Sequence, residues 1–147
     1  MVSSRRLLSL RDTARAMSQQ NVENVRASID AYNRGDWDAA LKDAAPGFEL
    51  DLTRAIGPQH DVYALGQIRG FWSEFAESWE SVWVEPHEFI DSGEHVVVPL
   101  TMHTRGRDGI EVRARVTWTW TFRDGAAVGI CMYQNREEAL EAVGLSE

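Results

Sequence analysis

The sequence predicts an α+β fold: a strongly curved antiparallel sheet, wrapped around about three N-terminal helices, with a short helix closing the chain. Helical periodicity runs through residues 18–44 and returns at 68–79, whereas four segments of strand character follow one another from 81 to 134. Turn signals separate these strands, the strongest being Asp124-Gly125. Helices grouped ahead of a meander of strands indicate one curved sheet rather than alternating β-α units.

The first helix is expected to begin at Ser18, whose hydroxyl can accept from a free backbone N–H, and to end at Gly35. One face of this helix collects apolar residues at helical spacing: Val22, Val25, Ile29 and Tyr32. A second helix, capped by Asp36, is expected to reach Ala44. A third helix is expected from its own apolar stripe: Ile68, Phe71, Trp72, Phe75 and Trp79.

Alternating residues predict the strands, and the first of them covers residues 48–53, followed by a loop over 54–66. The later strands are expected at 81–91, bent at Pro86, and then at 95–105, 110–123 and 127–134. A last short helix is expected over 136–143.

The long strand at 110–123 is amphipathic. One face carries Val112, Ala114, Val116, Trp118, Trp120 and Phe122, and the other carries arginine and threonine. The apolar face is expected to pack under the helices, and the polar face either meets water or forms a subunit interface. The sequence leaves two alternatives for the large inward residues: they fill the core, or they line a pocket. The pocket-lining candidates are Trp72, Phe75, Val116, Trp118 and Trp120.

Composition excludes several classes of protein. The chain has 147 residues, a net charge of −8 and a pI near 5.0. We therefore expect no nucleic-acid partner, because phosphates require a basic surface. No apolar run approaches the length of a membrane span, so no membrane partner is expected. The single cysteine, Cys131, makes no internal disulfide, which agrees with a cytoplasmic protein.

No metal or cofactor site is expected. One cysteine rules out a zinc site with several cysteine ligands. No pair of histidines has ligand spacing with a carboxylate partner, and no glycine-rich loop could hold a phosphate.

Residues 1–16 differ in character from the rest of the chain. They hold four arginines and one acid, and their apolar stretch stops at Arg11, too early for a secretory signal. We interpret residues 1–16 as a disordered extension, or as the product of an upstream start codon with Met17 as the true beginning. The single folded domain is expected over 17–147.

Several segments in order resemble the SnoaL-like family of the nuclear transport factor 2-like (NTF2-like) superfamily. The segment Tyr32-Asn33-Arg34-Gly35-Asp36-Trp37 resembles its helix–Gly-Asp–helix opening, and Trp120-Thr121-Phe122-Arg123-Asp124-Gly125 resembles its last hairpin. The resemblance spans about residues 18–145. It implies a cone open at one end, often dimeric through the outer sheet face, and often holding a small apolar molecule.

The resemblance also suggests candidates for chemistry. Ketosteroid isomerases of this superfamily carry a carboxylate base on the strand after the second helix, where Asp51 falls. Strand alternation points Asp51 outward, unless a bulge reverses it. In those isomerases a tyrosine and an acid bind the oxyanion. Ser28 and Trp118 fall at about those two positions in this chain, so ketosteroid isomerase activity itself is not expected. Tyr32, one helical turn later, could substitute; its alternative is a core tyrosine.

The loop after Asp51 supplies the residues expected at the rim of the cone: Arg54, His60 and Asp61. They could orient a polar group of a ligand, although loop polarity alone also accounts for them. The main hypothesis is a protein that binds an apolar or aromatic small molecule, with or without cofactor-independent isomerase, cyclase or hydrolase chemistry. The alternative is a non-catalytic dimeric interaction or carrier module whose cone is filled.

Overall fold

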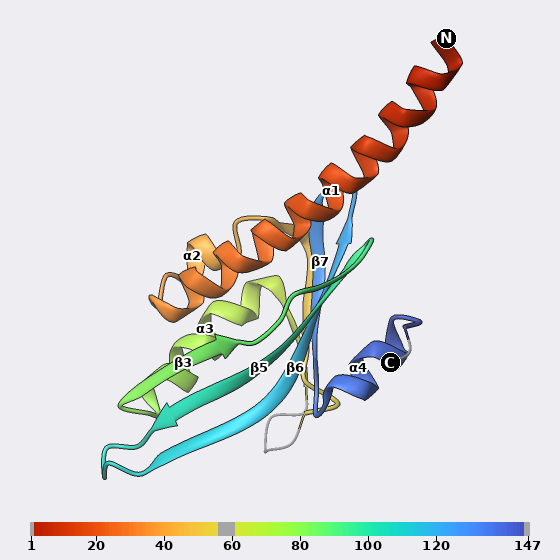
Figure 1. Cartoon of the computed structure of the whole chain (residues 1–147). Coiled ribbons are helices and arrows are strands. Elements are labelled where there is room, and N and C mark those ends of the chain that lie inside the picture. The colour runs from red at the N-terminus through yellow and green to blue at the C-terminus, as the bar shows by residue number, and fades with distance from the viewer. Residues whose placement is uncertain (1, 56–60, 146–147) are drawn as a thin grey trace.

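Helix α1 (Val2–Asn33) lies across the concave side of a seven-stranded sheet (Figure 1). The computed structural model describes residues 2–55 and 61–145, with side chains from Leu10 onward. The other helices and strands follow in chain order: α2 (Trp37–Ala40), β1 (Ala44–Asp51), β2 (Val62–Ala64), α3 (Leu65–Glu77), β3 (Ser81–Pro86), β4 (Ile90–Ser92), β5 (His95–Arg105), β6 (Glu111–Arg123), β7 (Ala126–Tyr133) and α4 (Arg136–Ala142).

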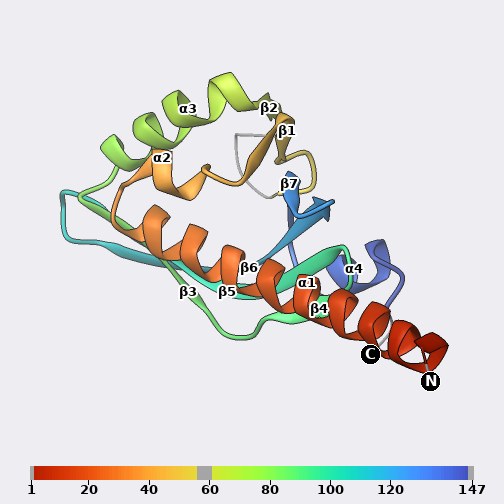
Figure 2. The same cartoon turned by 90° about the horizontal axis from the view of Figure 1, so that it is seen from above.

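The strands lie in the order β2-β1-β7-β6-β5-β3, and β4 also pairs with β5. Every pair is antiparallel except β1 with β7. Register shifts interrupt β1 between Ala44 and Glu49, and β6 between Thr121 and Phe122. Such bulges bend strands. Figure 2 shows the result: the sheet curves from β1, beside α3, round to β3, beside α1.

The predicted α+β architecture, a curved sheet around N-terminal helices, is confirmed. The first helix, however, begins at Val2 rather than at Ser18, and its N-terminal turns project beyond the sheet (Figure 1). Residues 2–34 contain neither glycine nor proline, so no residue in that segment breaks the helix. Leu10 and Met17 are exposed on the projecting part. Its helical backbone differs from the disorder expected for residues 1–16; the domain boundary at 17 stays a prediction.

The second helix is shorter than predicted. Asp36 caps it as expected, accepting from the Ala39 N–H at 3.1 Å. The chain then enters β1 at Ala44, because pairing with Ala127 of β7 begins there. Pro46 and Gly47 follow within the irregular part of β1.

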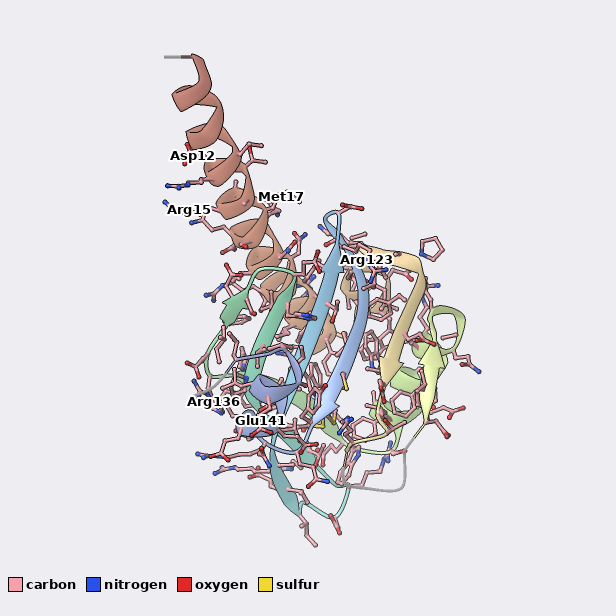
Figure 3. The ribbon with its side chains drawn as sticks, turned by 90° about the vertical axis from the view of Figure 1, so that its right-hand side faces the viewer. Asp12, Arg15, Met17, Arg123, Arg136 and Glu141 are labelled. Carbon is pink, nitrogen blue, oxygen red and sulfur yellow. The ribbon has the colours of Figure 1, made fainter. Side chains whose placement is uncertain are left out.

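Helix α4 covers part of the outer sheet face (Figure 3). Leu140 and Tyr133 lie there in a small buried cluster with Val97. Thr117 and Thr119 of β6 are buried as well. The expectation that the polar face of β6 is wet or forms an interface therefore fails for this half of the strand.

An asparagine ties α1 to the edge strand β3. The Asn33 amide donates to the Val84 carbonyl at 2.9 Å and accepts from the Val84 N–H at 2.8 Å. Val84 is fully buried, so these two hydrogen bonds satisfy backbone groups that have no access to water. They fix the C-terminal end of α1, where Tyr32 lies. Within the described residues, no helix has the length and apolar character to cross a bilayer.

Candidate functional site

A cavity of about 150 Å³ lies between α1, α3 and the concave face of the sheet. Its wall consists of apolar and aromatic side chains: Tyr32, Leu50, Leu52, Ala55, Phe71, Trp72, Phe75, Met102, Ala114, Val116, Trp118, Ile130 and Met132. The cavity is therefore an apolar chamber in a cone that the side chains only partly fill.

Local structure explains why these residues meet. Ala114, Val116 and Trp118 alternate along β6, so all three point to the concave side. Leu50 and Leu52 follow the same rule where β1 ends. On α3 and α1, helical spacing turns the aromatic residues of the wall toward the strands.

Aromatic rings close one end of the cavity. The Tyr32 ring stands nearly perpendicular to the rings of Trp72 and Trp118, with centroids 5.2 Å and 5.8 Å away. Trp37 adds a tilted contact to Tyr32 at 5.5 Å. Edge-to-face packing of this kind stabilises aromatic clusters beyond the area that they bury. Four rings from three helices and one strand thus fix the position of the Tyr32 hydroxyl.

The polar groups of the wall are few. Burial raises the pKa of Tyr32, so its hydroxyl stays protonated and able to donate a hydrogen bond. The Trp118 indole N–H is buried and has no hydrogen-bond partner among the described residues. Among the residues that the structure describes, no carboxylate, imidazole or basic side chain lines the cavity. The wall can hold an apolar body and donate to an acceptor, but it offers no strong general base.

Four of the five residues predicted to line a pocket lie in this wall: Trp72, Phe75, Val116 and Trp118. The fifth, Trp120, lies instead beside a smaller hollow between α1, α2 and the sheet, together with Ser28. The Ser28 hydroxyl donates there to the Ala40 carbonyl at 2.8 Å. Trp120 is two residues further along the bent strand, which carries it past the cavity.

Asp51 does not line the cavity. Phe48, Leu50 and Leu52 are buried on the concave side, and Asp51 points to the outer side, as alternation predicts. Its carboxylate accepts from the backbone N–H and the hydroxyl of Thr53, at 2.9 Å and 2.6 Å. The structure therefore does not bring Asp51 together with Tyr32.

Neither Arg54 nor Asp61, two of the predicted rim residues, lines the cavity. The Arg54 guanidinium pairs with Glu138 of α4 at 3.6 Å and lies over the Tyr133 ring, on the outer side of the sheet. The Asp61 backbone carbonyl accepts from the Leu52 N–H at 3.0 Å. His60 lies outside the described residues.

The rest of the wall was missed by sequence reasoning: Leu50, Leu52, Ala55, Phe71, Met102, Ala114, Ile130 and Met132. Leu50, Phe71 and Ala114 carried a usable signal, because each falls on an apolar face that alternation or helical spacing already marks. Across residues 2–55 and 61–145, no group of three or more His, Cys, Asp or Glu side chains is placed to hold a metal ion.

Comparison with known proteins identifies the fold. The model of the SnoaL-like domain matches residues 25–130. No match was found among curated proteins. Among solved structures, an NTF2-like protein of unknown function from Burkholderia pseudomallei is 22% identical, with a TM-score of 0.69 over 85% of this chain and 98% of that one.

Two further solved structures have named activities or ligands. TerC, co-crystallised with polyporic acid, is 21% identical, with a TM-score of 0.69 over 84% of this chain and 98% of TerC. SalBIII, an epoxide hydrolase/cyclase-like enzyme in pyran ring formation of salinomycin, is 16% identical, with a TM-score of 0.66 over 81% of this chain and 94% of SalBIII. At these identities the likeness shows the fold alone.

Proposed function

This chain belongs to the SnoaL-like domain family, and from its central cavity we propose that it binds a compact apolar or aromatic small molecule bearing one hydrogen-bond acceptor. The observation that carries the proposal is the composition of the wall. Apolar side chains surround the space, and among the described lining side chains the Tyr32 hydroxyl, protonated because burial raises its pKa, can donate a hydrogen bond. Binding sites of this kind combine an apolar surface with a few polar groups that orient the ligand.

The cavity volume limits the size of the ligand. A space of about 150 Å³ is that of an engineered apolar cavity known to accept benzene. A single ring, or a small bicyclic molecule, therefore fits, whereas a larger molecule would extend beyond the chamber. One protein with the same fold was co-crystallised with a small molecule, polyporic acid, which supports a binding role without naming this chain's ligand.

We propose binding rather than acid–base catalysis as the primary activity. A proton transfer in the cavity needs a group within hydrogen-bond reach of the bound molecule. Asp51 points to the opposite side of the sheet, and the Tyr32 phenol, whose pKa is raised by burial, is a weak proton acceptor at neutral pH. Among the described lining residues, Tyr32 is the titratable side chain on which isomerase, cyclase or hydrolase chemistry would rely.

The test is a thermal-shift and calorimetric screen with single-ring and bicyclic aromatic alcohols, ketones and phenols. A ligand at 100 times its Kd adds about 2.7 kcal/mol of stability. Val116→Phe fills the chamber and is expected to abolish binding. Val112→Phe, on the same strand face but outside the wall, is the matched control and is expected to bind normally.

Two outcomes would contradict the proposal. No stabilisation by any compound of suitable size would favour the non-catalytic interaction module. Equal binding by the wild type and Val116→Phe would place the ligand outside the cavity.

The second candidate function is an interaction module that forms a homodimer. It is favoured by the part of the outer sheet face that α4 leaves uncovered. Trp83 is 45% exposed there, stacked on His103 with ring centroids 4.1 Å apart. Glu85 and Arg113 lie on the same face, and a two-fold axis could pair them between copies. Light scattering is expected to report a dimer that Trp83→Glu dissociates and that Ile110→Glu, off this face, does not. A monomeric wild type would contradict this candidate.

A further inference from the structure

A second hollow, of about 210 Å³, lies on the outer side of α3, where that helix meets β2. Its wall contains Tyr63 from β2 and four residues of α3: Phe71, Glu74, Phe75 and Ser78. The α3 residues follow at intervals of three, one and three, so they form one stripe on the helix surface. None of them is a basic residue.

Aromatic rings dominate this hollow. Tyr63 and Phe71 are stacked, with ring centroids 4.3 Å apart and planes 22° from parallel. Phe75 continues the row, 6.4 Å from Phe71. The face of an aromatic ring carries negative charge density, which attracts cations, and all three rings border the hollow.

Negative charge accompanies the rings. No ion pair joins the Glu74 carboxylate to another described side chain, whereas neighbouring acids such as Asp38 and Glu80 pair with arginines. Burial raises the pKa of Tyr63, and the charges of Asp61 and Glu74 raise it further, so the fields of both carboxylates reach this ring.

We propose that this hollow is a binding site for a small organic cation of the alkylammonium class. Such cations are attracted to the faces of aromatic rings, and a carboxylate beside the rings adds charge complementarity. Three aromatic rings, a carboxylate without an ion pair to any described side chain, and a described lining without basic residues favour a cation over an anion. An alkylammonium ion, whose charge is surrounded by apolar groups, also loses less hydration free energy than a metal ion when it binds in such a hollow.

This hollow is separate from the inner cavity, for which an apolar ligand is proposed, but the two spaces share a wall. Phe71 and Phe75 line both spaces. A cation seated against these rings limits their motion and so changes the space available inside. Binding at one site is therefore expected to alter affinity at the other, in a reciprocal way.

The experiment is a titration of the full chain with choline, followed by amide resonances in nuclear magnetic resonance spectra. The neutral isostere 3,3-dimethylbutan-1-ol, in which carbon replaces the ammonium nitrogen, is the matched probe. Choline is expected to shift the amides of Tyr63, Glu74 and Ser78, with at least threefold higher affinity than the isostere. Added salt is expected to weaken the choline response, because exposed charges are screened.

Two variants sharpen the test. Glu74→Gln is expected to reduce choline affinity at least threefold, while Glu77→Gln, on the same helix but outside the hollow, is expected to leave it unchanged. Equal affinity for choline and its neutral isostere would overturn the proposal, as would shifts confined to inner-cavity residues such as Met132. The absence of any shift at millimolar choline would overturn it too.

Discussion

The Tyr32 ring meets the Trp118 ring edge to face, with centroids 5.8 Å apart and planes at 84°. The contact joins the last turn of α1 to the middle of β6, and it holds the Tyr32 ring against the wall of the cavity. Trp118 holds its N–H buried without a partner. A buried donor left unpaired costs free energy, and its complete burial keeps this N–H from the cavity space, so hydrogen bonding to a ligand falls to the Tyr32 hydroxyl.

Tyr32→Phe is expected to separate the apolar and polar parts of recognition. The substitution keeps the ring contacts and removes only the hydroxyl. For a ligand with a carbonyl or hydroxyl acceptor, loss of one hydrogen bond of about 1 kcal/mol weakens binding roughly fivefold. A hydrocarbon of the same shape is expected to bind the wild type and the variant equally. Isothermal titration calorimetry with such a ligand pair measures both effects.

An equal loss of affinity for both members of the pair would mean that the variant has disturbed the aromatic cluster. An unchanged affinity for the acceptor-bearing ligand would show that the Tyr32 hydroxyl does not contact it.

Asn33→Leu is expected to destabilise the fold by about 2–4 kcal/mol. The side chain makes both hydrogen bonds to the backbone of the buried residue Val84, so its loss leaves a buried N–H and a buried carbonyl unpaired. Asn24→Leu is the control, since its amide accepts only from the exposed Gln20 and its loss is expected to cost less than about 0.5 kcal/mol. Urea denaturation measures both. Equal stabilities for the two variants would show that water forms hydrogen bonds with the Val84 backbone N–H and carbonyl once the asparagine is gone.

Much of the fold follows from local patterns. The strand at 95–105 has the predicted bounds, because alternation and flanking turns mark both of its ends. The family and the cone follow from motif order, and the family match over 25–130 confirms them. Long-range pairing was not predictable in the same way. Ala44 lies in a strand because it pairs with β7, and no sequence pattern near Ala44 indicates that pairing.

The candidate site was harder to predict than the fold. Alternation placed Val116 and Trp118 correctly on the concave side, but it could not say that a bend in β6 would separate Trp120 from them. The C-terminal helix was expected, yet its cover over Thr117 and Thr119 depends on packing that no local pattern encodes. A cavity forms where side chains leave space unfilled in the packed structure, and local sequence patterns do not indicate where that happens.

Alkaline pH is expected to destabilise the protein through its tyrosines. Burial, followed by a hydrogen bond with Cys131, raises the pKa of Tyr133 to about 12, and burial raises the pKa of Tyr32 as well. An unfolded tyrosine loses its proton near pH 10, whereas these two keep theirs in the folded state. Because the folded state then binds more protons than the unfolded state, stability falls as pH rises.

The stabilising effect is therefore fully present below about pH 10 and is lost as pH rises through the folded-state pKa values. Besides its three tyrosines the chain has one lysine, Lys42, and one cysteine, Cys131. Burial also raises the pKa of the Cys131 thiol, so this group adds to the loss of stability from about pH 8.5 upward. Urea midpoints measured from pH 8 to 11.5 are expected to decline, and to decline most steeply above pH 10, where the tyrosines titrate. Tyr133→Phe removes one of the two tyrosines and is expected to make the decline shallower. Parallel declines in the wild type and the variant would show that Tyr133 keeps an ordinary pKa in the folded state.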